Sequence, residues 1–593
     1  MTGPSGFSPS SLVTPRCGSW LRPRLRNPRV LKVPRATPRT SRRSSVTSTP
    51  TTTTTTLSKQ QDGMISMHAQ LAPERKPTAE QKGLSVAAEI ILTDLRALIA
   101  DLGKDGGLAN GSVYDTAMVV RLAPPEEGTD AAVEWLLSQQ HADGGWDNPK
   151  VLRARDMPTL AAVLALHVRG KDERARSAVE RGLEFIRAQR PHWTVLPEDL
   201  LVGVEMNLPR LLDEAQALGL DVPMDQYAAV IEDGKRRREK LGRLKQLHFG
   251  TPPALTWDGW GTEPDPALVD PEGGIGPCPA ATAAWVRAAQ GRPELKELVA
   301  KARQYLRNAE AGTNVRLPGV VPATWRIDLM EQEWGLLALL CAGLLAHPQL
   351  ADVVKPHLDT LEAAFTPRGI GFTKYFMPDG DCTAVTIAVL KAANRPVDMS
   401  ALNQFKRGNH FYTYPQETHP SLTTTAHAAM ALSLAGEDTS SWTRAMLELQ
   451  SADGRWLIDK WQTSWLYTTT HVMLAIPEPE VMRNSIATLL RCQKKDGGWG
   501  ADVRSTRLET AFAVLVLHGL RNKGVEEEAI RSALSRANGY LRRTYQPFVM
   551  SGEEDLKFLH EDPMWIGKAL YHPFRMDRAF ELSAMLALAL EEG

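Results

Sequence analysis

The chain has 593 residues, of which 43% are hydrophobic and 23% charged, and its formal net charge is +0. A chain of this length and balance can bury two or three cores of ordinary size, which excludes disorder throughout. The neutral balance predicts no extended basic face for nucleic acid. The five cysteines lie far apart and in no metal-binding spacing, which favours a reduced intracellular protein over a disulfide-linked secreted one.

The N-terminal segment differs from the rest of the chain in composition. Residues 1–61 contain no Asp or Glu and are rich in Arg, Pro, Ser and Thr, which predicts a disordered extension over residues 1–77. The segment resembles an organelle transit peptide, or it precedes the true start of translation at Met64 or Met67. We therefore expect a cytoplasmic protein, or an organelle-targeted one if the transit peptide is genuine.

The remaining sequence favours helices almost everywhere. Apolar residues recur at three- and four-residue intervals from Leu84 to Ile99 and again from Leu160 to His167, which is the spacing of one helix face. The longest apolar run, residues 335–346, is too short to cross a bilayer and predicts a buried helix. The pattern predicts an all-α protein without a stable membrane span.

Three segments share the pattern Q-x-x-D-G-x-W, namely residues 140–146, 450–456 and 493–499. Each follows an amphipathic helix. We expect the Gln to hydrogen-bond backbone groups at the helix end, the Gly to form a left-handed turn, and the Trp to pack back on the helix. The same local structure is thus predicted three times.

Two carboxylates stand two residues apart, at Asp379 and Asp381, immediately before an apolar helical stripe. One interpretation is a helix N-cap followed by a first-turn carboxylate. The other is a buried pair, in which repulsion and desolvation keep one carboxyl protonated at neutral pH. A neutral aspartic acid in an apolar cavity is a proton donor.

The segment Asp379-Gly380-Asp381-Cys382-Thr383-Ala384 resembles D-x-D-D-T-A, the acid motif of class II terpene cyclases, which protonate a carbon–carbon double bond. The three turns resemble the QW motifs of the same enzymes. Further segments are similar to the diterpene branch: residues 112–117, 203–215, 279–284, 459–461, 509–511 and the W-I-G-K ending at 565–573. The resemblance covers roughly residues 85–585, in order.

This resemblance implies two α/α-barrel domains, called β and γ, behind the disordered extension. The γ barrel is expected at residues 105–314, inserted between an N-terminal piece of β at 78–104 and the remainder of β at 315–593. The active cavity would lie between the barrels, with Asp381 on the β side.

The resemblance also implies roles for individual residues. Asp381 is the expected acid, supported by Asp379, and aromatic rings would stabilise the cations: Trp461, Trp257, Tyr467 and Phe372. Core packing is the competing interpretation for the last three. The substrate diphosphate would contact Lys568 and Arg575, with Mg²⁺ held by Glu198, Asp199 and Glu205, although these charges also suit a solvated helix face. No D-D-x-x-D metal cluster occurs, so the diphosphate is expected to remain in the product.

Two positions depart from the family pattern. Cys382 replaces an Asp, as in oxidosqualene cyclases, and Thr425 replaces the Asn expected to hydrogen-bond the acid. A thiol and a hydroxyl are different hydrogen-bonding partners from a carboxylate and an amide, so the acid strength or the substrate is expected to be altered. The base that takes the final proton is open among His248, His427 and His471, each of which also suits an ordinary core position.

The sequence thus predicts a class II diterpene cyclase that converts geranylgeranyl diphosphate to a bicyclic, copalyl-like labdane diphosphate. A class I terpene synthase or a phosphatase would act downstream. Alternatives are a cyclase of an epoxidised prenyl diphosphate, a squalene- or oxidosqualene-type cyclase, and a non-catalytic α/α-barrel binding module. Retention of both Asp379 and Asp381 argues against the last.

Overall fold

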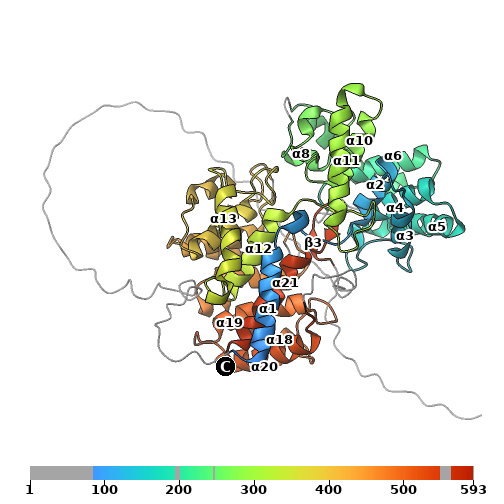
Figure 1. Cartoon of the computed structure of the whole chain (residues 1–593). Helices are drawn as coiled ribbons and strands as arrows, with labels where there is room; N and C mark the ends of the chain where they lie inside the picture. The colour runs from blue at the N-terminus through green and yellow to red at the C-terminus, as the bar shows by residue number, and fades with distance from the viewer. Residues whose placement is uncertain are drawn as a thin grey trace, which may run out of the picture. The chain divides into compact units, whose positions relative to one another are not determined.

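The computed structural model describes residues 84–193, 201–244, 247–417, 419–457, 459–547 and 563–591 (Figure 1). The predicted extension at residues 1–77 lies outside these ranges. The described part is mainly helical, as predicted, and its strands form two short hairpins: β1 (Lys406–Arg407) with β2 (His410–Phe411), and β3 (Trp565–Ile566) with β4 (Leu570–Tyr571). Within it, no helix has the length and apolar character that a bilayer crossing requires.

Six helices of the described C-terminal half form a closed ring. They are α12 (Asp328–Cys341), α14 (Gly380–Ala392), α15 (Leu422–Leu434), α17 (Trp465–Ala475), α19 (Arg507–Leu520) and α21 (Phe574–Ala589). Each packs against the next, and α21 packs against α12. The outer helices are α1 (Val86–Asp101), α13 (Ala351–Ala364), α16 (Ser440–Glu448), α18 (Arg483–Cys492) and α20 (Glu527–Thr544). Inner and outer helices together make an α/α barrel, called here the C-terminal barrel.

A second ring is formed by α2 (Val113–Leu122), α4 (Asp156–Arg169), α6 (Val204–Ala217), α9 (Trp257–Trp260) and α10 (Pro279–Ala289). Its outer helices are α3 (Asp130–Ser138), α5 (Glu173–Ala188), α7 (Ala228–Leu241) and α11 (Lys296–Ala311), and α8 (Pro252–Leu255) precedes α9. We call this the N-terminal barrel. The exact domain boundaries predicted from the sequence stay predictions.

Short 3₁₀ helices connect these elements. They span Lys104–Gly106, Leu152–Ala154, Arg190–His192, Met224–Tyr227, Pro266–Leu268, Pro293–Leu295, Pro348–Leu350, Met399–Phe405 and Pro479–Met482.

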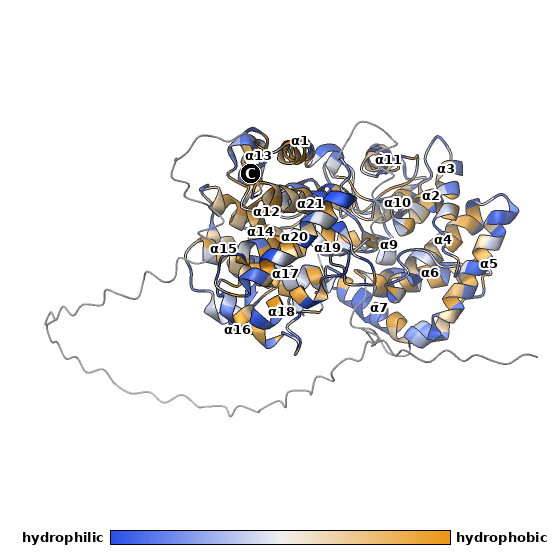
Figure 2. Ribbon diagram, turned by 90° about the horizontal axis from the view of Figure 1, so that it is seen from below, coloured by the Kyte–Doolittle hydropathy of each residue, from blue (hydrophilic) through white to orange (hydrophobic). Residues whose placement is uncertain are grey.

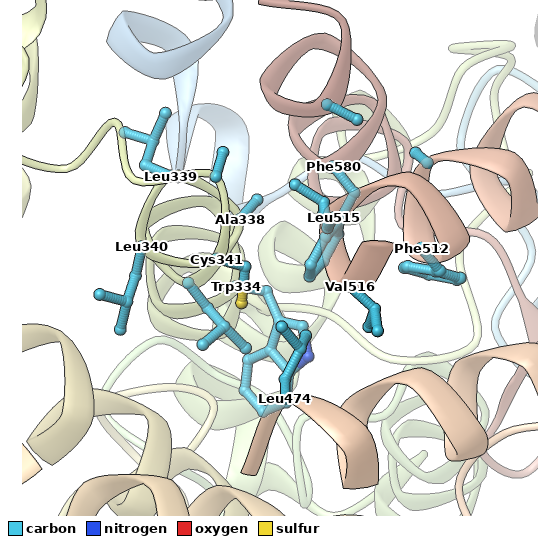
Figure 3. Close-up of a cluster of buried hydrophobic side chains, with 14 of the residues drawn as sticks. Trp334, Ala338, Leu339, Leu340, Cys341, Leu474, Phe512, Leu515, Val516 and Phe580 are labelled. Carbon is cyan, nitrogen blue, oxygen red and sulfur yellow. The ribbon is translucent and has the colours of Figure 1, made fainter. Parts of the chain in front are cut away.

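Buried apolar side chains of the described residues form two cores that follow the two rings. The first core joins α1 to the helices from α12 onward, and Figure 3 shows its centre, where Trp334, Leu474, Phe512 and Phe580 converge from four inner helices. The second core lies within residues 113–325 and also includes Ala569 and Leu570, which come from the β3–β4 hairpin. The C-terminal segment therefore contributes to both cores.

Inner helices are buried on nearly every side. In α14 all residues from Gly380 to Leu390 are buried, and in α21 every residue is buried. Outer helices keep a polar face, and in Figure 2 α7 is largely hydrophilic while α12 is largely hydrophobic. An inner helix is covered by the outer ring on one side and by its neighbours on the other, so a polar stripe has no place on it.

The Q-x-x-D-G-x-W turns have the predicted structure. In the first, the Gln140 side chain donates to the carbonyl oxygens of Gly144 and Ala178, both at 2.9 Å, and the Trp146 indole donates to the Leu136 carbonyl at 2.7 Å. Leu136 lies in α3 and Ala178 in α5. Each turn therefore does more than end a helix, because it joins two consecutive outer helices.

The two other turns repeat the Trp contact and the third also repeats the Gln contacts, whereas Gln450 of the second donates to the Ser485 hydroxyl at 2.8 Å and to the Gly454 carbonyl at 3.3 Å. Trp456 and Trp499 each donate at 2.7 Å to a carbonyl oxygen of the preceding outer helix, and Gln493 donates at 2.8 Å to Gly497 and to Ala533 of α20. Gly497 has a φ of +93°, and a Cβ at this position would lie 2.4 Å from the backbone oxygen of Arg536. Glycine is therefore required at this position both by the turn and by the approach of the next helix.

Candidate active site

The carboxylate pair lies at the N-terminal end of inner helix α14. Asp379 is the N-cap residue, and its Oδ1 accepts from the backbone N–H groups of Asp381 at 3.0 Å and Cys382 at 2.8 Å. The capping interpretation therefore describes Asp379 correctly. Burial, together with the neighbouring charge of Asp381, raises the pKa of Asp379 to about 7. The cap is also a carboxyl group that holds a proton near neutral pH.

Asp381 is buried and contacts a histidine from the neighbouring inner helix. His427 of α15 lies with Nδ1 2.6 Å from Oδ1 of Asp381. The ring of His427 is buried, and its Nε2 has no hydrogen-bond partner among the described residues. The sequence left His427 open as a base or a core residue, whereas the structure makes it the direct partner of the expected acid.

A second buried histidine, His471 of α17, lies behind the first. The two rings are 5.3 Å apart, and His471 Nδ1 lies 2.9 Å from the carbonyl oxygen of Tyr467. Burial, with a contribution from the neighbouring His427, lowers the pKa of His471 to about 3. His471 is therefore neutral at physiological pH. His248, the third candidate base, is exposed and contacts the carbonyl of Phe249.

Aromatic rings surround this pair of histidines. Tyr467 stacks on His471 with ring centres 3.9 Å apart and packs against Phe512 and Trp565 at 5.3 and 5.4 Å. Trp334 of α12 meets His427 edge-on at 6.0 Å and donates to the Tyr467 hydroxyl at 3.3 Å. The structure thus brings Tyr467 to the acid site, in company with rings that the sequence analysis did not single out.

The other predicted aromatic residues lie elsewhere. Trp461 is half-buried, donates to the Thr413 hydroxyl at 2.7 Å and lies under the ammonium of Lys460. Phe372 packs against Phe376 at the edge of the first core. Trp257 is buried in the second core. Their roles toward a substrate stay predictions.

The two departures from the family pattern have distinct surroundings. The Thr425 hydroxyl donates to the carbonyl of Ser421 at 2.8 Å and accepts from the Phe411 N–H at 3.0 Å. The Thr425 hydroxyl therefore hydrogen-bonds backbone groups, whereas His427, two residues further along the chain, contacts Asp381. The Cys382 thiol is buried and interacts with the carboxyl groups of Asp379 and Glu333. The sequence analysis missed Glu333, although a Glu beside an apolar run that predicts a buried helix was a usable signal.

The predicted diphosphate-binding cations are both buried. Lys568 lies in the turn of the β3–β4 hairpin and donates to Asp258 Oδ1 at 2.7 Å, to the Leu255 carbonyl at 3.0 Å and to Cys278 Sγ at 3.0 Å. These acceptors occupy all three ammonium hydrogens.

Arg575, at the start of α21, pairs with Glu331 at 3.1 Å, and its Nε has no partner among the described residues. The diphosphate role of both cations stays a prediction.

The predicted Mg²⁺ ligands are placed only in part. Glu198 and Asp199 lie outside the described residues. Glu205 is buried and pairs with Arg237 at 3.0 Å. The described ranges contain no group of three or more His, Cys, Asp or Glu side chains arranged to hold a metal ion. Magnesium stays a prediction from the sequence.

These contacts define a double α/α-barrel protein whose C-terminal barrel carries a buried acid site of Asp379, Asp381 and His427. Comparison with known proteins agrees with this class. No protein-family model matches the chain. It is 43% identical over 528 residues to the (+)-kolavenyl diphosphate synthase of Herpetosiphon aurantiacus, covering 86% of this chain and 99% of that protein. It is 30% identical over 521 residues to the ent-copalyl diphosphate synthase of a Streptomyces species, covering 81% and 93%.

The structure is also similar to that of the ent-copalyl diphosphate synthase from Streptomyces platensis, with a TM-score of 0.67 and 27% sequence identity over 85% of this chain and all of that one. The chain therefore belongs to the class II diterpene cyclase family and is an enzyme of that class. The similarity predicted from the acid motif, the turns and the W-I-G-K ending is confirmed.

Proposed function

We propose that this enzyme cyclises geranylgeranyl diphosphate to a bicyclic labdane-type diphosphate by proton transfer from Asp381. The observation that carries the proposal is the contact of 2.6 Å between Asp381 and His427, buried at the end of an inner helix. A carboxyl group sheltered from water, with one fixed partner, can deliver a proton to an alkene and leave its negative charge compensated.

The reaction conserves the atoms of its substrate. The Asp381 proton forms a new C–H bond at the terminal double bond, the resulting cation closes two rings, and a base removes a proton at the end. Aromatic faces stabilise the cations by roughly 0.5 to 2 kcal/mol each. Tyr467 is the candidate whose placement beside His471 and Trp565 supports this role most directly.

The diphosphate is expected to leave unchanged with the product. The relatives named above are diphosphate synthases, which supports retention of this group. Arg575 keeps its Nε without a partner among the described residues, which leaves a donor available to an anion. Mg²⁺, which would neutralise phosphate charge when bound, is proposed at Glu205 with Glu198 and Asp199. Release of Glu205 from Arg237 would have to accompany its binding.

An epoxidised prenyl diphosphate is a second candidate substrate. Cys382 lies directly after the acid, as in the oxidosqualene cyclase motif, and an epoxide accepts a proton more readily than an alkene. The Cys382 thiol interacts with two carboxyl groups of the site, so its presence next to the acid supports testing the epoxide in the same assay.

One experiment tests these candidates together. Purified protein is incubated with farnesyl, geranylgeranyl and epoxidised geranylgeranyl diphosphates and with squalene, then treated with phosphatase, and the products are analysed by mass spectrometry. We expect a bicyclic C20 alcohol from geranylgeranyl diphosphate. Conversion of squalene, or of the epoxide alone, would overturn the proposal. Titration of Mg²⁺ into EDTA-treated wild-type and Glu205→Gln enzyme tests the metal, because the variant should need more Mg²⁺ for half-maximal rate.

A further inference from the structure

A carboxyl group that the sequence analysis did not assign lies beside the acid site. Glu333 projects from inner helix α12 and is fully buried. Its Oε1 accepts from the Thr386 hydroxyl of α14 at 3.1 Å, and its Oε2 has no hydrogen-bond partner among the described residues. A buried carboxyl with one unpartnered oxygen is costly in a hydrophobic core, so its presence calls for an explanation other than packing.

Glu333 faces the acid motif itself. The Cys382 thiol interacts with the carboxyl groups of both Glu333 and Asp379, and the charges of Asp379 and Asp381 act on Glu333. From α15, His427 faces the same group of residues through Asp381. Burial raises the pKa of Glu333 well above its usual range, so Glu333 enters the site as a neutral carboxylic acid with a proton to donate.

We propose that Glu333 supplies, from α12, the third carboxyl group of the acid site, in place of the carboxylate that the family motif carries where this chain has Cys382. The motif D-x-D-D provides three carboxyls from one helix end. In this chain two of these carboxyl groups remain on α14, at Asp379 and Asp381. The carboxyl group of Glu333, from the adjacent inner helix, interacts with the Cys382 thiol that stands at the third position. Glu333 is a positioning residue: it adds a third, protonated carboxyl to a water-poor site, where it can donate a hydrogen bond to the thiol and carboxyl groups of α14 and so hold the acid motif in place.

The proposal rests on the cyclase activity proposed above and predicts an exchange between two positions. Glu333→Gln keeps the shape and one hydrogen-bonding oxygen but replaces the hydroxyl donor of the carboxylic acid with a weaker amide donor. It should lower kcat at least about tenfold, the effect expected when one hydrogen bond at the acid site is weakened, and leave the KM for geranylgeranyl diphosphate unchanged. Cys382→Asp in the same chain should restore most of the lost rate. Cys382→Asp alone adds a fourth carboxyl to the site and should lower kcat.

Cys382→Asp should therefore lower kcat in the wild-type background and raise it in the Glu333→Gln background. A merely structural role for Glu333 predicts no such reversal, because the two substitutions would then both be harmful when combined. Melting temperature and circular dichroism of all three variants control for folding. If Glu333→Gln does not fold, the Cys382→Asp single variant still tests the proposal. A raised kcat in that variant would contradict it. Full activity of Glu333→Gln, or no recovery in a folded double variant, would also overturn it. A wild-type enzyme without activity on geranylgeranyl diphosphate would instead overturn the proposed function.

Discussion

Both barrels place aspartates at the N-terminal ends of inner helices, but they use them differently. In the C-terminal barrel, Asp379 caps α14 and Asp381 contacts only a histidine in the ion pairs of the described residues. In the N-terminal barrel, Asp258 of α9 is paired with the ammonium of Lys568 at 2.7 Å. Burial raises the pKa of Asp379 to about 7 and that of Asp115, near Lys568, to about 6. An aspartate at the start of an inner helix is therefore a buried carboxyl with a raised pKa in one barrel and one half of an ion pair in the other.

The difference comes from the C-terminal hairpin. The β3–β4 turn inserts Lys568 among residues of the N-terminal barrel, where its ammonium also lies over the Tyr114 ring at 5.3 Å. A carboxylate paired with a buried cation is stabilised in its charged form, so it cannot serve as an acid. Asp379 has no cationic partner among the ion pairs of the described residues, and burial raises its pKa. The fold is shared, and the chemistry depends on which charge reaches each helix end.

The largest expected effect follows from removing the acid. Asp381→Asn should lower kcat at least about a thousandfold, because general acids contribute factors of this order and the first step has no other proton source in the proposed mechanism. Its amide can still contact His427, so the melting temperature and helix content should stay near those of the wild type. Product formation from geranylgeranyl diphosphate is the measurement. An active Asn variant would assign the acid to another residue.

The ion pair in the other barrel should matter for stability. Lys568→Met leaves Asp258 buried without its cation, and removing one member of a buried pair destabilises by about 3 to 5 kcal/mol. Urea unfolding monitored by circular dichroism gives the change. The matched control is Lys568→Met with Asp258→Asn, which removes both charges and should recover much of the loss.

This pair of variants also tests the predicted diphosphate role. If Lys568 contacts the substrate, the double variant should be stable but show a raised KM for geranylgeranyl diphosphate. An unchanged KM in a stable double variant would restrict Lys568 to joining the hairpin to the N-terminal barrel. A stable single variant would contradict the comparison between the barrels.

Sequence patterns were sufficient for the all-α fold and for placing the carboxylate pair at the start of a buried helix, whereas the role of Asp381 as the acid stays a prediction. Turn chemistry is local, so the contacts of Gln140 and Trp146 could be predicted from a seven-residue pattern. The start of α14 followed from the capping preference of Asp379. Such features depend on neighbours in sequence, which the sequence displays directly.

Contacts between helices distant in sequence were not predictable in this way. The pairing of His427 with Asp381 joins positions 46 residues apart, and that of Lys568 with Asp258 spans 310. The first depends on how two inner helices meet and the second on where the β3–β4 hairpin contacts α9, and one sequence specifies neither. The apolar run beside Glu333 signalled its burial, but its proximity to the thiol and carboxyl groups of α14 could not be read from its own segment.

Two buried groups, His471 in the C-terminal barrel and Asp156 in the N-terminal barrel, should change the free energy of unfolding in opposite directions as pH changes. The pKa of His471 is lowered to about 3 by burial, so between pH 6.5 and 3 the unfolded state binds a proton that the folded state does not. This group therefore removes about 1.4 kcal/mol of stability per pH unit as pH falls through that window. His471→Phe should abolish this contribution, measured as a flatter dependence of unfolding free energy on pH.

Asp156 of α4 is the counterpart in the N-terminal barrel. Burial raises its pKa to about 7, although it accepts hydrogen bonds from Tyr227 and Trp193. Between its usual pKa and 7 the folded state binds the extra proton, so this group removes stability as pH rises. Asp156→Asn should therefore change the slope in the opposite direction to His471→Phe. Slopes altered in the same direction would contradict the assigned protonation states.

The smallest expected change in stability comes from two Trp substitutions that test whether the barrels unfold as one unit. Trp146→Phe in the N-terminal barrel and Trp499→Phe in the C-terminal barrel each remove an indole donor from a helix carbonyl at 2.7 Å. Each should cost about 1 to 3 kcal/mol, the range for leaving a buried acceptor without its partner. Because Lys568 and the hairpin residues Ala569 and Leu570 join the second core, we expect a single calorimetric transition that both variants lower. Two transitions, each sensitive to only one Trp, would show that the hairpin does not couple the barrels.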